Sequence, residues 1–294
     1  MDIKKELKDK QLFVEDVLNK FTIKEGKPKS IFESFNYSLF VGGKRIRPIL
    51  LMESCKCVGG DINEVLPLMA AMEMIHTYSL IHDDLPCMDD DELRRGKPAN
   101  HTVYGEATAL LAGDSLLNLA YETMLKGAKS SKDINRYVEA MNVIADSAGV
   151  KGMIAGQVMD MESEGKEPDG ETLDFIHDNK TGAILRASVI SGAIVGGADN
   201  DELTNLSEYA RAIGLMFQVV DDILDVVSDE ETLGKKVGMD HERNKMTYPY
   251  VYGLEKSYEK VDELLDISLK SLSGFGCEAE FLRELAVYLA NRKN

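Results

Sequence analysis

The stretch "EVLPLMAAMEMIHTYSLIHDDLPCMDDDELRRG", residues 64–96, decides both the fold and the chemistry that we expect of this chain. Residues 64–84 predict one strongly apolar helix. Pro86 is expected to end or distort it, because the proline ring clashes with the preceding turn and lacks an N–H. Five aspartates and one glutamate crowd positions 82–92, and two arginines follow. A dense acidic cluster therefore follows the C-terminal end of an apolar helix.

The same helical pattern continues over the rest of the chain. Apolar residues recur every three to four positions, as in the stripe from Ile134 to Met159, which is long enough for about seven helical turns. Strand alternation is scarcely seen. The breaks, rich in Gly, Pro, Asn, Asp and Ser, fall near 24–30, 58–64, 82–96, 126–133, 163–170, 196–202 and 233–240. We therefore expect an all-α fold of about ten helices, in one domain that spans 1–294.

Composition limits the function classes. The chain has 294 residues, 44% of them hydrophobic, which suffices for a sizeable core. Its formal charge of −17 argues against general binding to nucleic acid or anionic membranes, because like charges repel. The first residues are charged, and the longest uncharged run, 187–198, is too short to span a bilayer. We expect a cytosolic protein without membrane insertion.

A second acidic motif, "FQVVDDILDVVSD" at 217–229, lies in another apolar helix. Asp221 and Asp225 are four residues apart, about 40° around the helix, with Gln218 on the same side. A lone motif of this kind would favour a solvated helix face. Two such motifs flanked by Leu, Ile, Val and Phe instead need solvent or cations, because unpaired buried carboxylates are costly. All-oxygen ligands suit Mg²⁺ shared with substrate phosphates, whereas the spacing does not fit a calcium EF-hand.

Further motifs accompany the two acidic ones, in one order along the chain. "GGKRIRP" (42–48) precedes them, "KTG" (180–182) stands between them, and "GKKVGMDHERNKMTYP" (234–249) follows. Together with "DDLPCMDDDELRRG" and "DDILD", this series resembles the trans-isoprenyl diphosphate synthases. The resemblance implies about ten helices around a deep central cavity, a homodimer, and head-to-tail condensation of isopentenyl diphosphate with an allylic diphosphate. The spacing of the first motif is similar to that of bacterial farnesyl diphosphate synthases.

The resemblance also implies the metal ligands. Asp83, Asp89 and Asp221 are expected to bind Mg²⁺ directly, and Asp84, Asp222 and Asp225 directly or through metal-bound water. In a continuous helix Asp83 and Asp89 would point about 120° apart, whereas Asp83 and Asp90 would align. Pro86 makes the continuous-helix assumption unsafe, so Asp90 stays open as the geometric rival of Asp89.

Two diphosphates need cations, and the resemblance assigns a set to each. The allylic set is Arg94, Lys180 and Lys235. The isopentenyl set is Lys44, Arg47, His76 and Arg95. "GGKRIRP" lacks the P-loop pattern, so its glycines are expected to allow close approach of phosphate at the start of a helix. Thr181, Gln218 and the Lys180 carbonyl are expected to direct oxygen dipoles at the carbocation, and the departed diphosphate to remove the last proton.

Product length is expected to depend on the residues four and five positions before Asp83. Ser79 and Tyr78 could floor the cavity that holds the hydrocarbon tail. The resemblance implies that an aromatic residue at this place accompanies a fifteen-carbon product, so Tyr78 predicts farnesyl diphosphate. Geranylgeranyl and geranyl diphosphates stay open as alternatives. A terpene cyclase is less favoured because the second motif is "DDILD" and cations exist for a second diphosphate. A non-catalytic synthase subunit is less favoured because it would be expected to lack one of the motifs.

Overall fold

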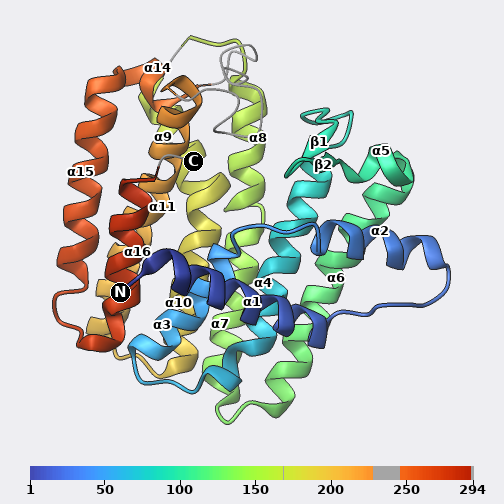
Figure 1. Ribbon diagram of the computed structural model, residues 1–294, viewed down its shortest axis with the longest axis horizontal. Coiled ribbons are helices and arrows are strands. Elements are labelled where there is room, and N and C mark those ends of the chain that lie inside the picture. Colours follow the sequence, from blue (N-terminus) through green and yellow to red (C-terminus); the bar gives the residue numbers. More distant parts are fainter. Residues whose placement is uncertain (168, 228–245, 293–294) are drawn as a thin grey trace. The chain divides into compact units, whose positions relative to one another are not determined.

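The structure, a computed structural model, describes residues 1–167, 169–227 and 246–292. Helices dominate these residues, as Figure 1 shows, and the all-α prediction is confirmed. The only strands in the described ranges are β1 (Leu93–Arg94) and β2 (Lys97–Pro98), an antiparallel pair in which Leu93 lies opposite Pro98. None of the described helices is long and apolar enough to cross a membrane.

The chain divides into two compact units. The N-terminal unit comprises residues 4–52 and 63–134, and the C-terminal unit comprises 1–3, 53–62 and 135–294. The first of these contains most of α1 (Ile3–Phe21), α2 (Lys29–Leu39), the start of α3 (Ile46–Cys57), α4 (Ile62–Asp83), α5 (Asn100–Tyr104) and α6 (Glu106–Ser130).

Helix α4 is the most buried helix of the N-terminal unit. Every side chain from Leu68 to Ile75 is buried, which covers all faces of the helix and is the pattern of a helix enclosed by others. Around it, α2 packs against α5 and α6, and the β1–β2 hairpin stands beside α5 in Figure 1. The acidic cluster thus follows directly after α4, and the buried apolar side chains of α4 fix that helix in place.

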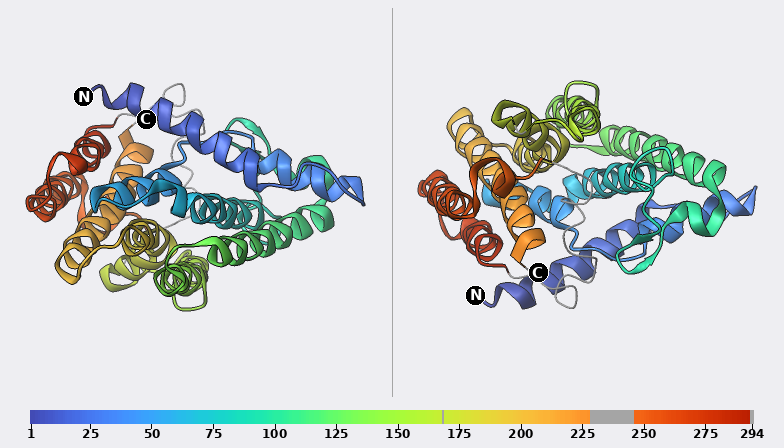
Figure 2. Two further views of the ribbon diagram at one scale, coloured as in Figure 1. Left: turned by 90° about the horizontal axis from the view of Figure 1, so that it is seen from below. Right: turned by 90° about the horizontal axis from the view of Figure 1, so that it is seen from above.

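In the C-terminal unit, helix α11 (Asn200–Val227) is the buried helix that carries the second acidic motif. It packs against α10 (Ala183–Gly196), α14 (Tyr248–Tyr252), α15 (Leu254–Ser271), α16 (Glu280–Ala290) and the π-helix η1 (His177–Gly182). Figure 2 shows α15 and α16 running alongside α11. The unit also holds α7 (Ile134–Ala148), α8 (Met153–Ser163), α9 (Gly170–Ile176) and the 3₁₀ turn η2 (Cys277–Ala279).

The apolar stripe at 134–159 is interrupted in the structure, contrary to the prediction of one helix of about seven turns. Helix α7 ends at Ala148 and α8 begins at Met153. Gly152 between them has φ −123° and ψ −118°, which no helix contains, and Val150 is 75% exposed. Apolar periodicity continued across a turn because glycines at both ends of the turn let the chain change direction without a proline or a polar run.

Candidate active site

The chain turns back on itself directly after α4. Beyond Asp83, the backbone N–H of Met88 donates to the Leu85 carbonyl at 2.8 Å, and that of Asp89 donates to the Asp83 carbonyl at 2.9 Å. The helix therefore ends three residues before Pro86, as predicted, and the tight turn brings Asp89 next to Asp83. Asp90 is exposed and has a φ of +52°. The turn explains how two aspartates at an unhelical spacing lie close together.

Asp84 is the buried carboxylate of this turn, and Arg94 is its cation. The Arg94 Nε donates to Asp84 Oδ1 at 2.8 Å, Nη2 makes a second contact with the same oxygen, and Nη2 also reaches Asp91 at 3.4 Å. Burial raises the pKa of the Asp84 carboxyl to about 6, although Arg94 opposes the shift. Asp84, Arg94 and Arg95 line one cavity of the N-terminal unit. Arg94, predicted to bind the allylic diphosphate, thus binds an aspartate of the metal motif here.

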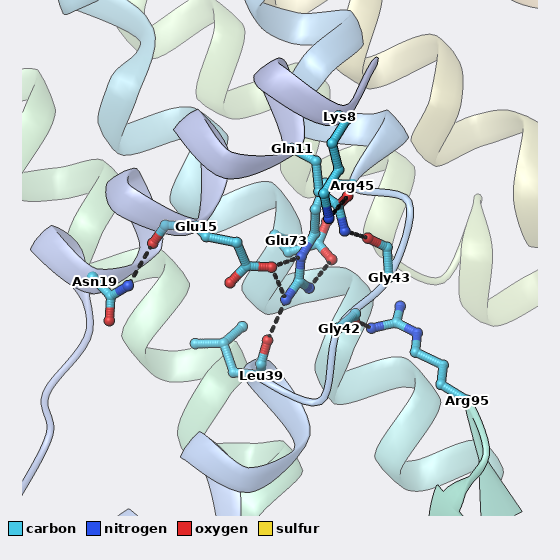
Figure 3. A network of polar contacts seen from close by, with 10 residues as sticks. All are labelled: Lys8, Gln11, Glu15, Asn19, Leu39, Gly42, Gly43, Arg45, Glu73 and Arg95. Carbon is cyan, nitrogen blue, oxygen red and sulfur yellow. Dashed lines mark hydrogen bonds and ion pairs between the residues drawn. The ribbon is translucent and has the colours of Figure 1, made fainter. Parts of the chain in front are cut away.

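The "GGKRIRP" loop gathers the predicted isopentenyl set. Gly42 and Gly43 have φ of +107° and +136°, and Arg95 donates from Nη1 to the Gly42 carbonyl (Figure 3). A Cβ on Gly43 would overlap the Arg95 guanidinium, so only glycine permits this close approach. Lys44 is exposed on the same loop, and α3 begins two residues later, as predicted.

His76 and Arg47 complete the predicted isopentenyl set. Arg47 Nη1 lies 3.3 Å from His76 Nε2, and because arginine can only donate, the imidazole nitrogen must accept. Burial lowers the pKa of His76 well below its usual value, and Arg47, Arg95, Arg45 and Arg94 lower it further. His76 is therefore neutral at physiological pH: its Nε2 accepts from Arg47, and its Nδ1 carries the proton and can donate.

Tyr78 and Ser79, predicted to limit product length, lie on α4 one turn before the acidic cluster. Tyr78 is 8% exposed, and its ring meets that of His82 edge-on at 5.7 Å. Burial raises the pKa of the Tyr78 phenol to about 12, with a contribution from Tyr121. The Ser79 hydroxyl donates to the His76 carbonyl of its own helix at 2.9 Å. Tyr78 is thus the bulky, enclosed member of the pair.

The second acidic motif lies near the C-terminal end of α11. Arg292 Nη2 forms an ion pair with Asp221, donates to the Phe217 carbonyl at 3.0 Å, and the guanidinium stacks 4.2 Å from the Phe217 ring. The Arg292 side chain is 2% exposed, whereas that of Asp221 is 47% exposed. Sequence reasoning missed Arg292, because nothing in the motif indicates a partner 71 residues away.

The other two aspartates of the motif differ in their surroundings. Asp222 Oδ2 accepts from the backbone N–H of Tyr248 at 2.7 Å and lies 3.4 Å from His177 Nε2. Asp225 is 5% exposed, and its Oδ1 is a buried oxygen that has no hydrogen-bond partner in the described part of the chain. A buried acceptor of this kind is suited to a cation.

The carboxylates of the two acidic motifs are suitable ligands for Mg²⁺ whose coordination is completed by substrate phosphates and water. In the described ranges, no three His, Cys, Asp or Glu side chains form a ready cage for a metal ion. Mg²⁺ does not require one, since it typically keeps several waters and uses one or two carboxylates together with substrate phosphates. Carboxylates at Asp83, Asp84 and Asp89 in one unit, and at Asp221, Asp222 and Asp225 in the other, supply only hard oxygen donors.

The "KTG" motif forms the π-helix η1, which contains Lys180 and Thr181. Lys180 Nζ donates to Asp160 Oδ2 of α8 at 2.6 Å. A Cβ on Gly156 would overlap the Lys180 backbone nitrogen, so the glycine lets α8 and η1 approach closely. The sequence held one signal for this pair: Asp160 is the single carboxylate of "GQVMD" (156–160) in an apolar helix, and a carboxylate in such surroundings needs a cation. Thr181 and Gln218 are half-buried, and Lys235 lies outside the described residues.

The described residues form a largely helical fold, and each of its two units carries an aspartate-rich helix end with an arginine beside it. A family model described as "Polyprenyl synthetase" matches residues 28–280. The chain belongs to this family, and it is therefore a prenyltransferase.

Relatives and solved structures agree with this membership. The chain is 50% identical over 273 residues to the heterodimeric geranylgeranyl pyrophosphate synthase large subunit 1 of Arabidopsis thaliana, covering 91% of this chain and 73% of that one. It is 45% identical to a geranylgeranyl diphosphate synthase of Cyanophora paradoxa, over 98% and 96% of the two chains. A solved FPP/GFPP synthase of Zymomonas mobilis matches with a TM-score of 0.87 and 34% identity, over 98% and 99%.

Proposed function

We propose that this protein condenses isopentenyl diphosphate head-to-tail with allylic diphosphates in a Mg²⁺-dependent reaction. The observation that carries the proposal is the pairing of Asp84, an aspartate of the first acidic motif, with Arg94, a cation of the allylic set. Carboxylates for a metal and guanidinium groups for phosphate oxygens are the two components that stabilise a leaving diphosphate.

Each residue then has a defined task. Bound Mg²⁺ would neutralise charge that builds on the departing diphosphate. Several Mg²⁺ ions are expected, held by Asp83, Asp84 and Asp89 in one unit and by Asp221, Asp222 and Asp225 in the other. Arg94, Lys180 and Lys235 would bind the allylic diphosphate. The gathered group of Lys44, Arg47, His76 and Arg95 would bind isopentenyl diphosphate. Thr181 and Gln218 would orient their oxygens toward the allylic cation, and no side chain acts as the final base.

For the product we propose geranylgeranyl diphosphate, the C20 compound, in place of the farnesyl diphosphate expected from the sequence. The reason is that the Arabidopsis and Cyanophora relatives are named geranylgeranyl synthases. Farnesyl diphosphate is the second candidate, because the buried Tyr78 favours a shorter cavity and the Zymomonas protein is named an FPP/GFPP synthase.

One assay tests both the proposed prenyl transfer and the proposed chain length of the product. The protein is incubated with Mg²⁺, isopentenyl diphosphate and dimethylallyl diphosphate, and the products are measured by mass spectrometry. A C20 product supports the first candidate and a C15 product the second. Turnover of farnesyl diphosphate without isopentenyl diphosphate would indicate a terpene cyclase, and absence of any turnover would indicate a non-catalytic subunit.

Three further properties stay predictions. A single domain spanning 1–294, a homodimer and a cytosolic location were expected from the sequence and its resemblance. The Arabidopsis relative is named as a subunit of a heterodimer and as chloroplastic, so a partner chain and a plastid are the alternatives. Sedimentation of the purified protein tests whether two copies associate.

A further inference from the structure

Arg45 stands between two residues assigned to isopentenyl diphosphate but differs from both in its surroundings. Its side chain is completely buried, whereas Lys44 is exposed and Arg47 is half-buried. Neither the sequence motifs nor the proposed function gives Arg45 a task. A fully buried arginine within a phosphate-binding loop requires an explanation, because burying a guanidinium without anionic partners is costly.

Three elements of the N-terminal unit meet at this guanidinium (Figure 3). Nε and Nη2 each lie 2.8 Å from Glu15 Oε1 on α1, and Nη1 lies 2.5 Å from Glu73 Oε1 on α4. Nη2 also donates to the Leu39 carbonyl, at the end of α2, at 2.7 Å. Arg45 thereby connects α1, α2 and α4 to the loop that carries it.

Helix α1 contacts the same loop at a second point. Gln11 lies one helical turn before Glu15, and its Nε2 donates to the Gly43 carbonyl at 2.7 Å. Arg95 donates to the neighbouring Gly42 carbonyl. Consecutive carbonyls of the loop are thus held by side chains from α1 and from the β1–β2 hairpin.

The loop needs such support because its backbone is in an unfavourable conformation. Arg45 has a φ of +52° although it is not a glycine, and Gly42 and Gly43 also have positive φ. A side chain in the left-handed region persists only where its surroundings over-determine it. The hydrogen bonds and ion pairs of the Arg45 guanidinium hold the backbone of Arg45 in this conformation. They thereby also fix the direction of the backbone at Lys44 and Arg47.

Arg45 differs from the cations assigned to diphosphate in the charges that surround it. Burial alone would lower the pKa of Arg45, but the carboxylates of Glu73 and Glu15 outweigh burial and raise it. Two carboxylates already neutralise this cation, so an incoming diphosphate gains little from it. Its contribution is therefore to geometry, not to the attraction of the anion.

We propose that Arg45 is a positioning residue for isopentenyl diphosphate, and that Gln11 and Glu15 make the N-terminal helix α1 part of that site. Glu15 and Glu73 fix the Arg45 side chain, Arg45 and Gln11 fix the loop, and the loop presents Lys44 and Arg47 to the substrate. The inference rests on the proposed function. Loosening the loop weakens binding of isopentenyl diphosphate, in ground and transition states alike, and leaves the allylic step unchanged.

Two variants on α1 test this, with a control on the same helix. Glu15→Gln keeps the shape and loses the charge, and Gln11→Ala loses the contact with Gly43. Each is expected to raise the KM for isopentenyl diphosphate about fivefold, while kcat and the KM for the allylic substrate change less than about twofold. Asn19→Ala removes only a bond to the Glu15 carbonyl within α1 and is expected to leave both KM values unchanged.

A second measurement keeps the two proposals separable. Calorimetric titration with inorganic diphosphate measures anion binding without turnover, and both variants should bind it more weakly than Asn19→Ala does. If the unaltered protein turns over both substrates but the variants raise both KM values equally, or lower only Tm, Arg45 has no positioning role. If the unaltered protein does not turn over, the proposed function fails, and unchanged diphosphate binding in the variants would overturn this inference as well.

Discussion

Tyr78 bears on which of the two candidate products forms, because a bulky side chain at this position favours the shorter, C15 product. Its ring is buried on α4, five residues before Asp83, and faces His82. If it floors the hydrocarbon cavity, Tyr78→Ala opens space for at least one more five-carbon unit and lengthens the main product. Chain length is measured by mass spectrometry with both five-carbon diphosphates as substrates.

Tyr78→Phe is the matched control, because it keeps the ring and removes only the hydroxyl. It is expected to leave the product distribution unchanged. An identical distribution in the alanine variant would show that Tyr78 is core packing, and the product would then depend on other residues.

If Asp84 holds Mg²⁺, as proposed, its raised pKa should make metal binding depend on pH. The folded pKa of about 6 exceeds the ordinary value of 3.8, so the folded, metal-free protein retains the Asp84 proton up to about pH 6. Mg²⁺ must displace that proton at lower pH, and its apparent affinity should fall about tenfold per pH unit below about 6. By the same sign, the stabilisation of the metal-free fold by this proton is lost as pH rises from about 4 through about 6.

Calorimetric titration of Mg²⁺ in the presence of inorganic diphosphate, between pH 5 and pH 8, checks this expectation. Asp89 provides the comparison, since Asp89→Asn should weaken binding at every pH but keep the pH dependence. Affinity that stays constant down to pH 5 would contradict the role of Asp84 as a titrating ligand.

At the scale of elements, Gly156 determines how closely α8 and the π-helix approach. A Cβ there would overlap the Lys180 backbone nitrogen, and backbone cannot move aside as a side chain can. Gly156→Ala should therefore destabilise the protein by about 1 to 3 kcal/mol and lower kcat, because Lys180 and Thr181 shift. Thermal unfolding and steady-state kinetics measure the two effects.

Gly274 supplies the control for this substitution. A Cβ at Gly274 meets no atom within 4 Å, and its φ is not positive. Gly274→Ala should keep Tm and kcat near the original values. Equal effects of the two substitutions would mean that the contact between α8 and η1 is unimportant.

The segment after α16 contacts α11 through the ion pair between Arg292 and Asp221. If Asp221 holds Mg²⁺, as proposed, this guanidinium competes with the metal. Mg²⁺ has to displace the guanidinium from this carboxylate, so Arg292→Met should raise Mg²⁺ affinity several-fold. The gain is modest because Asp221 is partly exposed and the ion pair is screened. Titration with Mg²⁺ and inorganic diphosphate measures it.

Arg211→Met is the comparison, because Arg211 is an arginine of α11 paired with Glu208 on the surface. It should leave Mg²⁺ affinity unchanged. Weaker binding in Arg292→Met would show instead that Arg292 assists the bound diphosphate.

These elements also show what the sequence could predict. Periodicity indicated the helices, and Pro86 indicated where α4 ends, because both depend on neighbours in the chain. The turn at 149–152 was missed, since the apolar stripe continues across it. The pairs Lys180 with Asp160 and Arg292 with Asp221 were missed because they join residues 20 and 71 positions apart, which no local pattern encodes. The motif order indicated the family, but not the product.

For the molecule as a whole, the fold should not depend on metal. The central helices α4 and α11 are held by buried apolar side chains. In the absence of metal, Arg94 already compensates Asp84, and Arg292 compensates Asp221. Chelation with EDTA should therefore abolish turnover while the helical circular dichroism is unchanged and Tm moves by less than about 5 °C.

Added Mg²⁺ should restore turnover, and Ca²⁺ should restore much less, because it is larger and prefers more ligands in looser geometry. The formal charge of −17 makes this the decisive measurement for the molecule, since the chain as a whole repels a diphosphate. Only the local cations and the metal offset that repulsion. Turnover that persists in EDTA would mean that arginine and lysine alone stabilise the leaving group, and unfolding in EDTA would mean that the arginines do not replace the metal structurally.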